Sequence, residues 1–212
     1  MTKTRQEAPD GVFSLHKAAG HLKTINAHKW EVMKGCFKIG LYRQGLMHDL
    51  SKYSPTEFIE GCLYYQEGRR SPNNGERESK GYSEAWMHHK GRNRHHYEYW
   101  NDYRLPGGGE DLFPVTTVRM PRKYVAEMLM DRIAASKTYQ KENYTQHGPL
   151  QYLQNGRGRK LMDPETYREL EIMLKILDER GEKELIRFVK DYYLKGFPME
   201  SRKKKKEREE QC

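Results

Sequence analysis

The chain has 212 residues, of which 35% are apolar and 33% charged, and its formal net charge is +9. This length supplies one good core with a small appendage, and 15 Tyr, 10 Met and 3 Trp exclude disorder throughout. No stretch approaches the roughly 20 apolar residues of a membrane span, so we expect no membrane partner. We find no secretory signal pattern, and the three cysteines form no CxxC pair. We therefore expect a cytoplasmic protein with reduced thiols.

Helical spacing of apolar residues dominates the chain. We predict helices over residues 13–38, 41–52, 55–65, 82–89, 95–103, 121–140, 163–181 and 182–196. Ser54 and Asp163 are placed as N-caps, each followed by a proline suited to a first helical turn, and Gly181 is placed as a stop. The polar segments 67–81 and 105–114 are expected to be loops. Because no strand pattern of any strength and no internal repeat occur, the predicted fold class is all-α.

The segment 121–140 has the clearest amphipathic pattern. One side of its predicted helix carries Val125, Met128, Leu129 and Ile133. Asp131 lies within this apolar pattern, and by itself it would be interpreted as a charge at the edge of the buried stripe. A buried carboxylate needs a partner, however, and a metal ion is among the best partners available.

Nine histidines occur, and four of them lie in the stretch HHKGRNRHH, residues 88–96. A lone histidine is more often a satisfied polar residue than a ligand, but two HH pairs across a short break favour a metal site. His28 lies on the first predicted helix, and the pair His48-Asp49 lies near the end of the second. Since side chains from several helices can converge inside a bundle, these residues and Asp131 are candidate ligands of one ion.

The order of these residues resembles the HD-domain superfamily of metal-dependent phosphohydrolases. Four blocks carry the resemblance over roughly residues 20–140: HKWEVM, LMHDLSKYSPTEF, AWMHHKGRNRHHYEYW and MPRKYVAEMLMDRIAAS. They look most like an uncharacterised branch, frequent in bacteria and their phages, with HDxSK and HHxxRNxHH motifs. The resemblance implies an HD-like metal-binding bundle, which we place over 13–140. The C-terminal third matches no motif, and from its helical pattern we expect C-terminal helices over 149–196 packed on the bundle. A disordered basic tail is expected over 197–212.

The resemblance also implies a ligand set and a second ion. The ligands of the first ion would be His28, His48, Asp49 and Asp131. In the histidine block, His89 and His95 are the favoured pair for the second ion. His88 and His96 are the alternatives, because spacing does not say which member of each doublet faces inward. The expected cofactors are one or two divalent metal ions, and these ligands do not distinguish Mn, Fe, Co, Zn and Mg.

Other polar side chains complete the candidate site. Lys52 is within reach of a phosphate oxygen and matches the lysine of the HDxxK variant of the superfamily. Arg92 and Arg94 could bind phosphate bidentately, or simply be solvated in so basic a chain. Glu127 could orient a histidine, and His21 is a reserve candidate ligand.

The leading functional hypothesis is metal-dependent hydrolysis of a small phosphorylated substrate, with a nucleotide as the substrate class. The resemblance implies that the bound ions activate water, so no nucleophilic side chain is required. The Gly-Tyr-Pro signature of cyclic-dinucleotide hydrolases is absent, which argues against that substrate. The alternatives are a mixed-valence di-iron oxygenase of the same fold and a non-catalytic module that binds nucleic acid through the basic tail. The sequence leaves the oligomeric state open.

Overall fold

The computed structural model describes residues 11–105, 115–156 and 158–196. Within these ranges the fold is all-α apart from one short hairpin, which confirms the predicted fold class. The basic tail expected over 197–212 lies outside the described residues, as does nearly all of the loop expected over 105–114. In the described part of the chain, no helix is long and apolar enough to cross a membrane.

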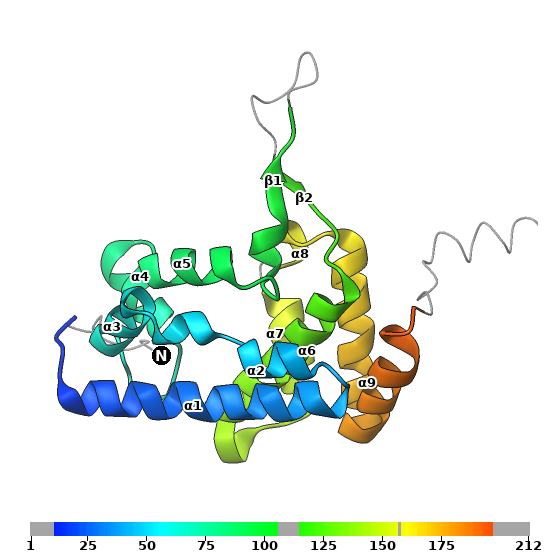
Figure 1. Ribbon diagram of the computed structural model, residues 1–212, viewed down its shortest axis with the longest axis horizontal. Helices are drawn as coiled ribbons and strands as arrows, with labels where there is room; N and C mark the ends of the chain where they lie inside the picture. The colour runs from blue at the N-terminus through cyan, green and yellow to red at the C-terminus, as the bar shows by residue number, and fades with distance from the viewer. Residues whose placement is uncertain (1–10, 106–114, 157, 197–212) are drawn as a thin grey trace, which may run out of the picture.

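Helices account for most of the elements. The α-helices are α1 (Leu15–Lys38), α2 (Tyr42–Met47), α3 (Pro55–Leu63), α4 (Pro72–Lys80), α5 (Glu84–Arg92), α6 (Arg122–Gln140), α7 (Gly148–Asn155), α8 (Gly158–Leu161) and α9 (Pro164–Phe188). Shorter elements are η1 (Leu50–Tyr53), η2 (Tyr97–Trp100), η3 (Lys141–Asn143), η4 (Val189–Tyr193), β1 (Asn101–Tyr103) and β2 (Val115–Thr117). Helix α1 runs along one side of the body, with α3, α4 and α5 gathered over one end and α9 at the other (Figure 1).

The core forms where α1, α6 and α9 pack together. Helix α6 buries the stripe expected from the sequence, which consists of Val125, Met128, Leu129 and Ile133. From α9 come Leu170, Met173, Leu174, Leu177 and Leu185, each with no exposed surface. Burial of one such side chain is worth roughly 1.5–3 kcal/mol. This packing fixes α6 beside α1, and both of these helices carry candidate metal ligands.

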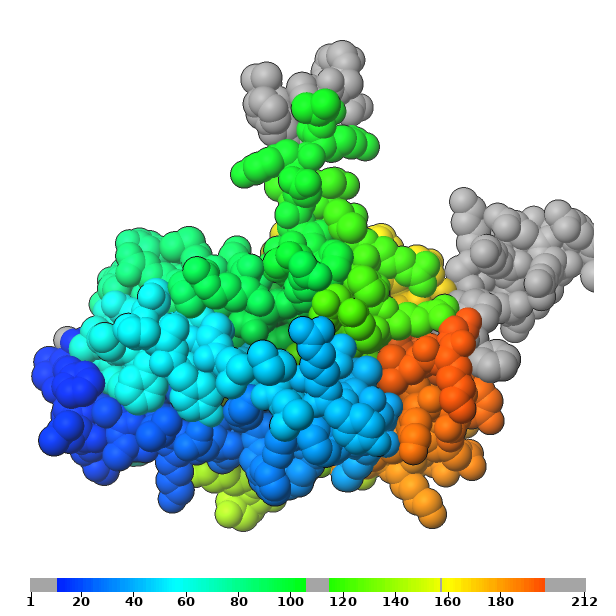
Figure 2. Space-filling view, in the orientation of Figure 1, coloured from blue at the N-terminus to red at the C-terminus, as the bar shows by residue number. Residues whose placement is uncertain are grey.

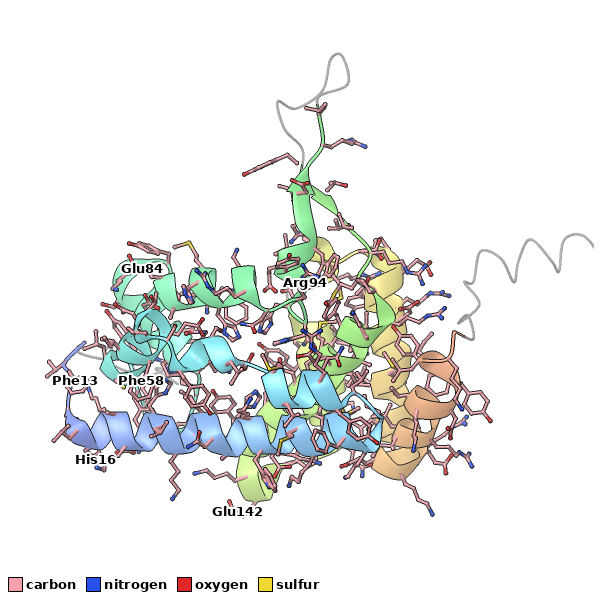
Figure 3. The ribbon with its side chains drawn as sticks, in the orientation of Figure 1. Phe13, His16, Phe58, Glu84, Arg94 and Glu142 are labelled. Carbon is pink, nitrogen blue, oxygen red and sulfur yellow. The ribbon has the colours of Figure 1, made fainter. Side chains whose placement is uncertain are left out.

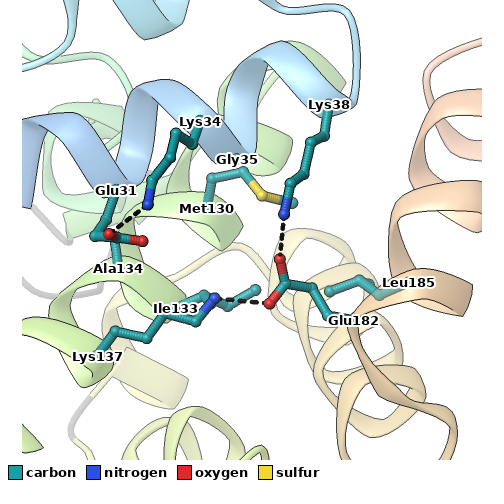
Figure 4. Close-up of a pocket in the computed structure, with 10 residues that line it drawn as sticks. All are labelled: Glu31, Lys34, Gly35, Lys38, Met130, Ile133, Ala134, Lys137, Glu182 and Leu185. Carbon is teal, nitrogen blue, oxygen red and sulfur yellow. Dashed lines mark hydrogen bonds and ion pairs between the residues drawn. The ribbon is translucent and has the colours of Figure 1, made fainter. Parts of the chain in front are cut away.

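Gly35 allows α1 and α6 to approach closely. A Cβ atom built on Gly35 would lie 2.9 Å from Sδ of Met130, so a larger residue would require movement of α6 or of this side chain. Beside this contact, Glu182 of α9 accepts hydrogen bonds from Lys38 at 2.8 Å and Lys137 at 2.6 Å (Figure 4). The two ion pairs connect all three core helices at the edge of a cavity of about 190 Å³.

Several predicted helix ends are confirmed. Ser54 Oγ accepts from the Glu57 amide at 3.5 Å, and Asp163 Oδ1 accepts from the Thr166 amide at 2.9 Å. Gly181, with φ 83° and ψ 171°, interrupts the helix where a stop was predicted. The helix resumes immediately, so α9 consists of two parts across a kink.

The loop predicted over 67–81 is wrong in its second half, where α4 forms. Pro72 occupies the first turn of α4, and Gly81 closes it in the left-handed conformation with φ 83°. Glu76 anchors the helix, because its buried carboxylate accepts from Ser83 Oγ and from the Glu84 amide. The sequence pattern did not predict this helix, because its residues are polar and it is held by a buried carboxylate instead of an apolar stripe.

The helix predicted over 95–103 and the absence of strands are also wrong. The segment forms η2 and then β1, which pairs antiparallel with β2 in the register Asn101↔Thr117 and Tyr103↔Val115. The hairpin projects from the body of the protein (Figure 2). Each strand has only three residues, which is too short for an alternating pattern to show in the sequence.

Candidate metal centre

An interruption of the helical conformation between α2 and η1 positions His48 and Asp49. The sequence predicted a continuous helix over 41–52, but α2 ends at Met47 and Asp49 adopts the left-handed conformation with φ 54° and ψ 26°. Aspartate tolerates this conformation better than most residues. Lys29 of α1 supports the break by donating to the carbonyl oxygens of Leu46 at 2.8 Å and His48 at 2.7 Å. The turn points both side chains inward, where His48 and Asp49 are each 1% exposed.

The first group of candidate ligands comes from α1, this break and α6. His28 Nε2 lies 3.0 Å from Asp131 Oδ1 and 3.8 Å from Asp49 Oδ2. His48 Nε2 lies 3.3 Å from Asp49 Oδ2 and 3.8 Å from Asp131 Oδ1. The structure therefore brings together the four residues that the sequence proposed for one ion, although they are spread over a hundred positions.

The second group comes from α5 and the segment after it. His89 Nε2 lies 3.3 Å and His95 Nε2 lies 3.2 Å from the same atom, Oδ1 of Asp49. His96 also offers a ring nitrogen to this group, whose ligand atoms all lie within 4.8 Å of one another. Asp49 thus presents Oδ2 to the first group and Oδ1 to the second, in the position of a bridging carboxylate.

The donor atoms fit a bound cation. Five of them are buried without a hydrogen-bond partner among the described residues: His28 Nε2, His48 Nε2, Asp49 Oδ1, His95 Nε2 and His96 Nε2. A buried polar atom without a partner costs about 1–3 kcal/mol. Imidazole nitrogens and carboxylate oxygens together suit Zn, Mn, Fe and Co. This buried His/Asp cluster could hold one or two divalent metal ions.

Two glutamates orient the histidines from behind. Oε1 of Glu127 lies 3.0 Å from Nδ1 of His48 and 3.1 Å from Nδ1 of His95. Oε2 of Glu57, on α3, lies 2.7 Å from Nδ1 of His89. A carboxylate that accepts the Nδ1 proton leaves the Nε2 lone pair free to face a metal. The sequence analysis suggested such a role for Glu127 but missed Glu57, whose only signal is its place one turn after a helix N-cap.

The charges in the centre keep its carboxylates ionised. Burial opposes ionisation of Asp49, but the neighbouring His48 imidazole and Lys52 ammonium outweigh burial and hold the pKa of Asp49 well below its usual value. Burial likewise opposes ionisation of Asp131, and its contact with His28 outweighs that effect and lowers the pKa of Asp131. Both groups are therefore available as anionic ligands near neutral pH.

The imidazoles differ in protonation. Burial lowers the pKa of His28 and of His96, so both rings are neutral near pH 7 and can offer a lone pair. Burial also opposes protonation of His95, but its close contacts with the carboxylates of Asp49 and Glu127 outweigh burial and raise its pKa to about 10. A cation that binds at His95 therefore displaces a proton.

Lys52 lies beside the centre at the wall of a large cavity. Its Nζ is 2.6 Å from Asp49 Oδ2, and its side chain is 29% exposed. The cavity has a volume of about 560 Å³, and His28, His89, His96 and Asp131 form part of its wall. Four arginines also line it, namely Arg69, Arg70, Arg77 and Arg132. This volume falls in the range of small-molecule sites, and the arginines favour an anionic ligand.

Three predicted site residues do not line this cavity, namely His88, Arg92 and Arg94. Nδ1 of His88 binds Glu57 at 2.6 Å, and His88 belongs to neither ligand group. Arg92 and Arg94 are exposed and do not line the cavity. Arg94 instead reaches toward Tyr124 near the base of the hairpin (Figure 3). Of the two alternatives for these arginines, phosphate binding is therefore corrected in favour of solvation: Arg92 is the last residue of α5, Arg94 follows it, and both side chains are exposed.

The reserve ligand His21 is also separate from the two ligand groups. It is buried and packs between the rings of Phe58 and Tyr65, with centroid distances of 5.6 and 6.0 Å. Gly61 lies directly against its imidazole. His21 therefore packs α1 against α3 beside the cavity.

Comparison with known proteins yields one family. The model of a family of unknown function, DUF5662, matches residues 17–176. No curated protein and no solved structure matches the chain. The matched range includes both ligand groups, both orienting glutamates and most of the cavity wall. Because the match covers more than half of the chain, the protein belongs to the DUF5662 family.

Proposed function

We propose that this protein is a metal-dependent phosphohydrolase of the HD type, acting on a nucleotide or a related phosphate ester. One observation carries the proposal: Asp49 presents its two oxygens to two groups of buried histidines, 3.3 Å from His48 on one side and 3.2 Å from His95 on the other. A carboxylate between two groups of nitrogen ligands is suited to a pair of divalent ions. Such a pair, when bound, lowers the pKa of a coordinated water and neutralises phosphoryl oxygens.

The chain's own residues would bind and orient the substrate. Lys52 has its ammonium next to Asp49, so it can donate to a phosphoryl oxygen at the same position. Glu127 and Glu57 hold the Nδ1 protons of the histidines and keep Nε2 directed inward. Among the arginines of the cavity wall, Arg69 and Arg70 are paired with Glu67 and Glu78. Arg77 and Arg132 would therefore supply the further positive charge for a phosphorylated ligand.

Phosphate release from a panel of nucleotides, measured with Mn²⁺, Co²⁺, Zn²⁺ or Mg²⁺ added, tests the proposal. We expect turnover with at least one ion, and loss of turnover in His48→Ala. Exposed His147 is the matched control, and His147→Ala should retain full activity. Equal and negligible rates for the wild type and His48→Ala would reject hydrolysis. Two irons per chain with a mixed-valence resonance, and no phosphate release, would instead support the oxygenase alternative.

A further inference from the structure

Aromatic rings and cations lie side by side at the base of the projecting hairpin. The ring centroids of Tyr99 and Trp100, on η2, lie 5.4 Å apart, and that of Trp100 lies 5.9 Å from that of Tyr124 on α6. The Arg94 guanidinium lies 5.6 Å from the Tyr99 centroid (Figure 3), and the Lys123 ammonium lies 4.9 Å from the Tyr124 centroid. We call these five residues the hairpin-base cluster.

Trp100 anchors the cluster to the body of the protein. Its Nε1 donates to the carbonyl oxygen of Arg94 at 2.8 Å, and its own carbonyl oxygen accepts from the Val118 amide at 2.7 Å. Its ring packs against the hydrophobic core. Arg94 also donates to the Tyr124 hydroxyl at 3.5 Å, so both cations of the cluster meet at the Tyr124 side chain. The cluster is therefore formed before any ligand binds.

The cluster is open to solvent and carries positive charge. Tyr99 is 37% exposed, and the side chains of Arg94 and Lys123 are exposed. Both cations have tyrosine partners, and within the described residues neither forms an ion pair with a carboxylate. Of the neighbouring acidic residues, Glu98 lines the cavity and Asp102 accepts from the following backbone amide at 2.8 Å. The charge of the two cations is thus available to an anionic ligand.

The hairpin extends the same chemistry away from the body. Tyr103 lies three residues after Trp100 on β1, at most about 11 Å along the chain, and is 73% exposed. Arg104 follows it and is also exposed. Val115, which faces Tyr103 across the hairpin, is 62% exposed, so the described strands leave the Tyr103 ring largely uncovered. A second exposed ring and a further cation therefore lie beyond the cluster.

This alternation of rings and cations favours one class of ligand. A single-stranded nucleic acid offers phosphates to the cations and unstacked bases to the rings. A duplex keeps its bases stacked inside, and a polyphosphate has no base, so either would leave the rings without a partner. The hairpin projects from the body (Figure 2), so it would keep a planar membrane away from its base.

We propose that the hairpin-base cluster, together with Tyr103 and Arg104, binds single-stranded nucleic acid. The cations Arg94, Lys123 and Arg104 contact phosphates, and the rings of Tyr99 and Tyr103 stack against bases. Such binding is tolerant of base sequence, because every base offers a face for stacking. The inference does not depend on the proposed hydrolysis, since none of these residues lines the cavity at the metal centre.

Fluorescence anisotropy with a labelled oligothymidylate of about 12 nucleotides, a length within the range of known single-strand sites, tests the proposal. The full chain is titrated in EDTA, so that metal-dependent turnover does not interfere. We expect binding at low salt that is tighter than to a duplex of the same length. Tyr99→Ala and Tyr103→Ala should each weaken it about tenfold. Lys123→Gln should lower the slope of log affinity against log salt concentration by about 0.7, the contribution of one phosphate contact.

Two controls change exposed side chains on other elements. Tyr42→Ala on α2 and Lys23→Gln on α1 should bind like the wild type. Thermal unfolding of each variant reports whether it is folded, and Tyr103 is so exposed that its replacement should leave the fold intact. Binding in EDTA by a protein that releases no phosphate from any nucleotide would support this site and reject hydrolysis.

Three results would overturn the proposal. The first is no binding at low salt, or equal affinity for the duplex. The second is loss of binding on deletion of residues 202–208 with full affinity in Tyr99→Ala and Tyr103→Ala, because the basic tail would then be the binding segment. The third is binding of phosphatidylserine vesicles, weakened in Tyr103→Ala, by a protein that does not bind the oligonucleotide.

Discussion

Oε1 of Glu127 lies 3.0 Å from Nδ1 of His48, although the two residues are 79 positions apart in the sequence. The same oxygen lies 3.1 Å from Nδ1 of His95, which belongs to the other ligand group. One buried carboxylate therefore orients an imidazole in each half of the metal centre. Glu57, in contrast, contacts histidines on the α5 side only.

This asymmetry predicts different metal losses for the two glutamates. Glu127→Ala leaves two buried Nδ1–H groups unpaired, so the affinity for both of the proposed ions should fall about 10- to 100-fold. Glu57→Ala should weaken only the ion held by His89. Metal content after equilibrium dialysis, measured by mass spectrometry, distinguishes the two variants. Loss of both ions in Glu57→Ala, or of neither in Glu127→Ala, would contradict the assignment.

The shared position of Asp49 predicts a similar contrast among the ligands themselves. Asp49→Ala removes an oxygen from each group, so neither ion should be retained after dialysis. Asp131→Ala removes an oxygen that lies beside His28, His48 and His95 but not beside His89, and one ion should remain at His89 and Asp49. Metal-to-protein ratios measure both effects. A ratio of one in Asp49→Ala would show that this carboxylate does not serve both groups.

Lys52 should affect the reaction more than the metal content. Lys52→Gln removes the ammonium next to Asp49 but none of the nitrogen or oxygen ligands. We expect full metal content and a decrease in phosphate release of about 10²- to 10³-fold, the effect typical for loss of one group that stabilises transition-state charge. Lys34→Gln, which breaks a surface pair with Glu31, is the control. An unchanged rate would remove Lys52 from the proposed machinery.

A side chain at Gly61, beside the cavity, should lower the stability of the protein. A Cβ atom at Gly61 would lie 2.1 Å from Nε2 of His21, which is itself confined by Phe58 and Tyr65. Gly61→Ala should therefore destabilise the protein by about 1–3 kcal/mol. In Gly91→Ala the new Cβ meets nothing within 4 Å, and the higher helix propensity of alanine should stabilise α5 by about 0.5–1 kcal/mol. Urea unfolding measures both; a Gly61→Ala variant as stable as the wild type would contradict the packing.

Protonation of His21, which is not a candidate metal ligand in either group, should make the stability of the protein depend on pH. Burial and the Lys52 charge lower the pKa of His21 from 6.5 to about 4. Since the unfolded chain binds this proton more readily, stability is complete above pH 6.5 and falls as the pH decreases toward 4. The full loss corresponds to about 3 kcal/mol. The non-titrating variant His21→Leu should lose that much less than the wild type between pH 7 and pH 4. If the stability of the wild type and of His21→Leu fell equally between pH 7 and pH 4, this prediction would be wrong.

Some features of the centre could be predicted from the residues alone. The histidine doublets of residues 88–96, and the carboxylate of Asp131 inside an apolar helical stripe, indicated a metal site, and the resemblance of the motif order implied His28, His48, Asp49 and Asp131 as ligands. The all-α class and the buried face of α6 followed from periodicity, which depends only on local geometry. Proline and glycine marked several helix ends for the same local reason.

Tertiary structure alone decided how these residues meet. The left-handed turn at Asp49 depends on its burial and on Lys29 from another helix. The choice of His89 over His88 depends on which ring faces Asp49, and spacing within a doublet carries no such information. Glu57 contacts His89 because α3 packs against α5, which the sequence does not show. Arg92 and Arg94 face solvent at the end of α5 and just after it. Short-range patterns determine the type and face of a helix, whereas contacts between distant segments determine which polar atoms share a cavity.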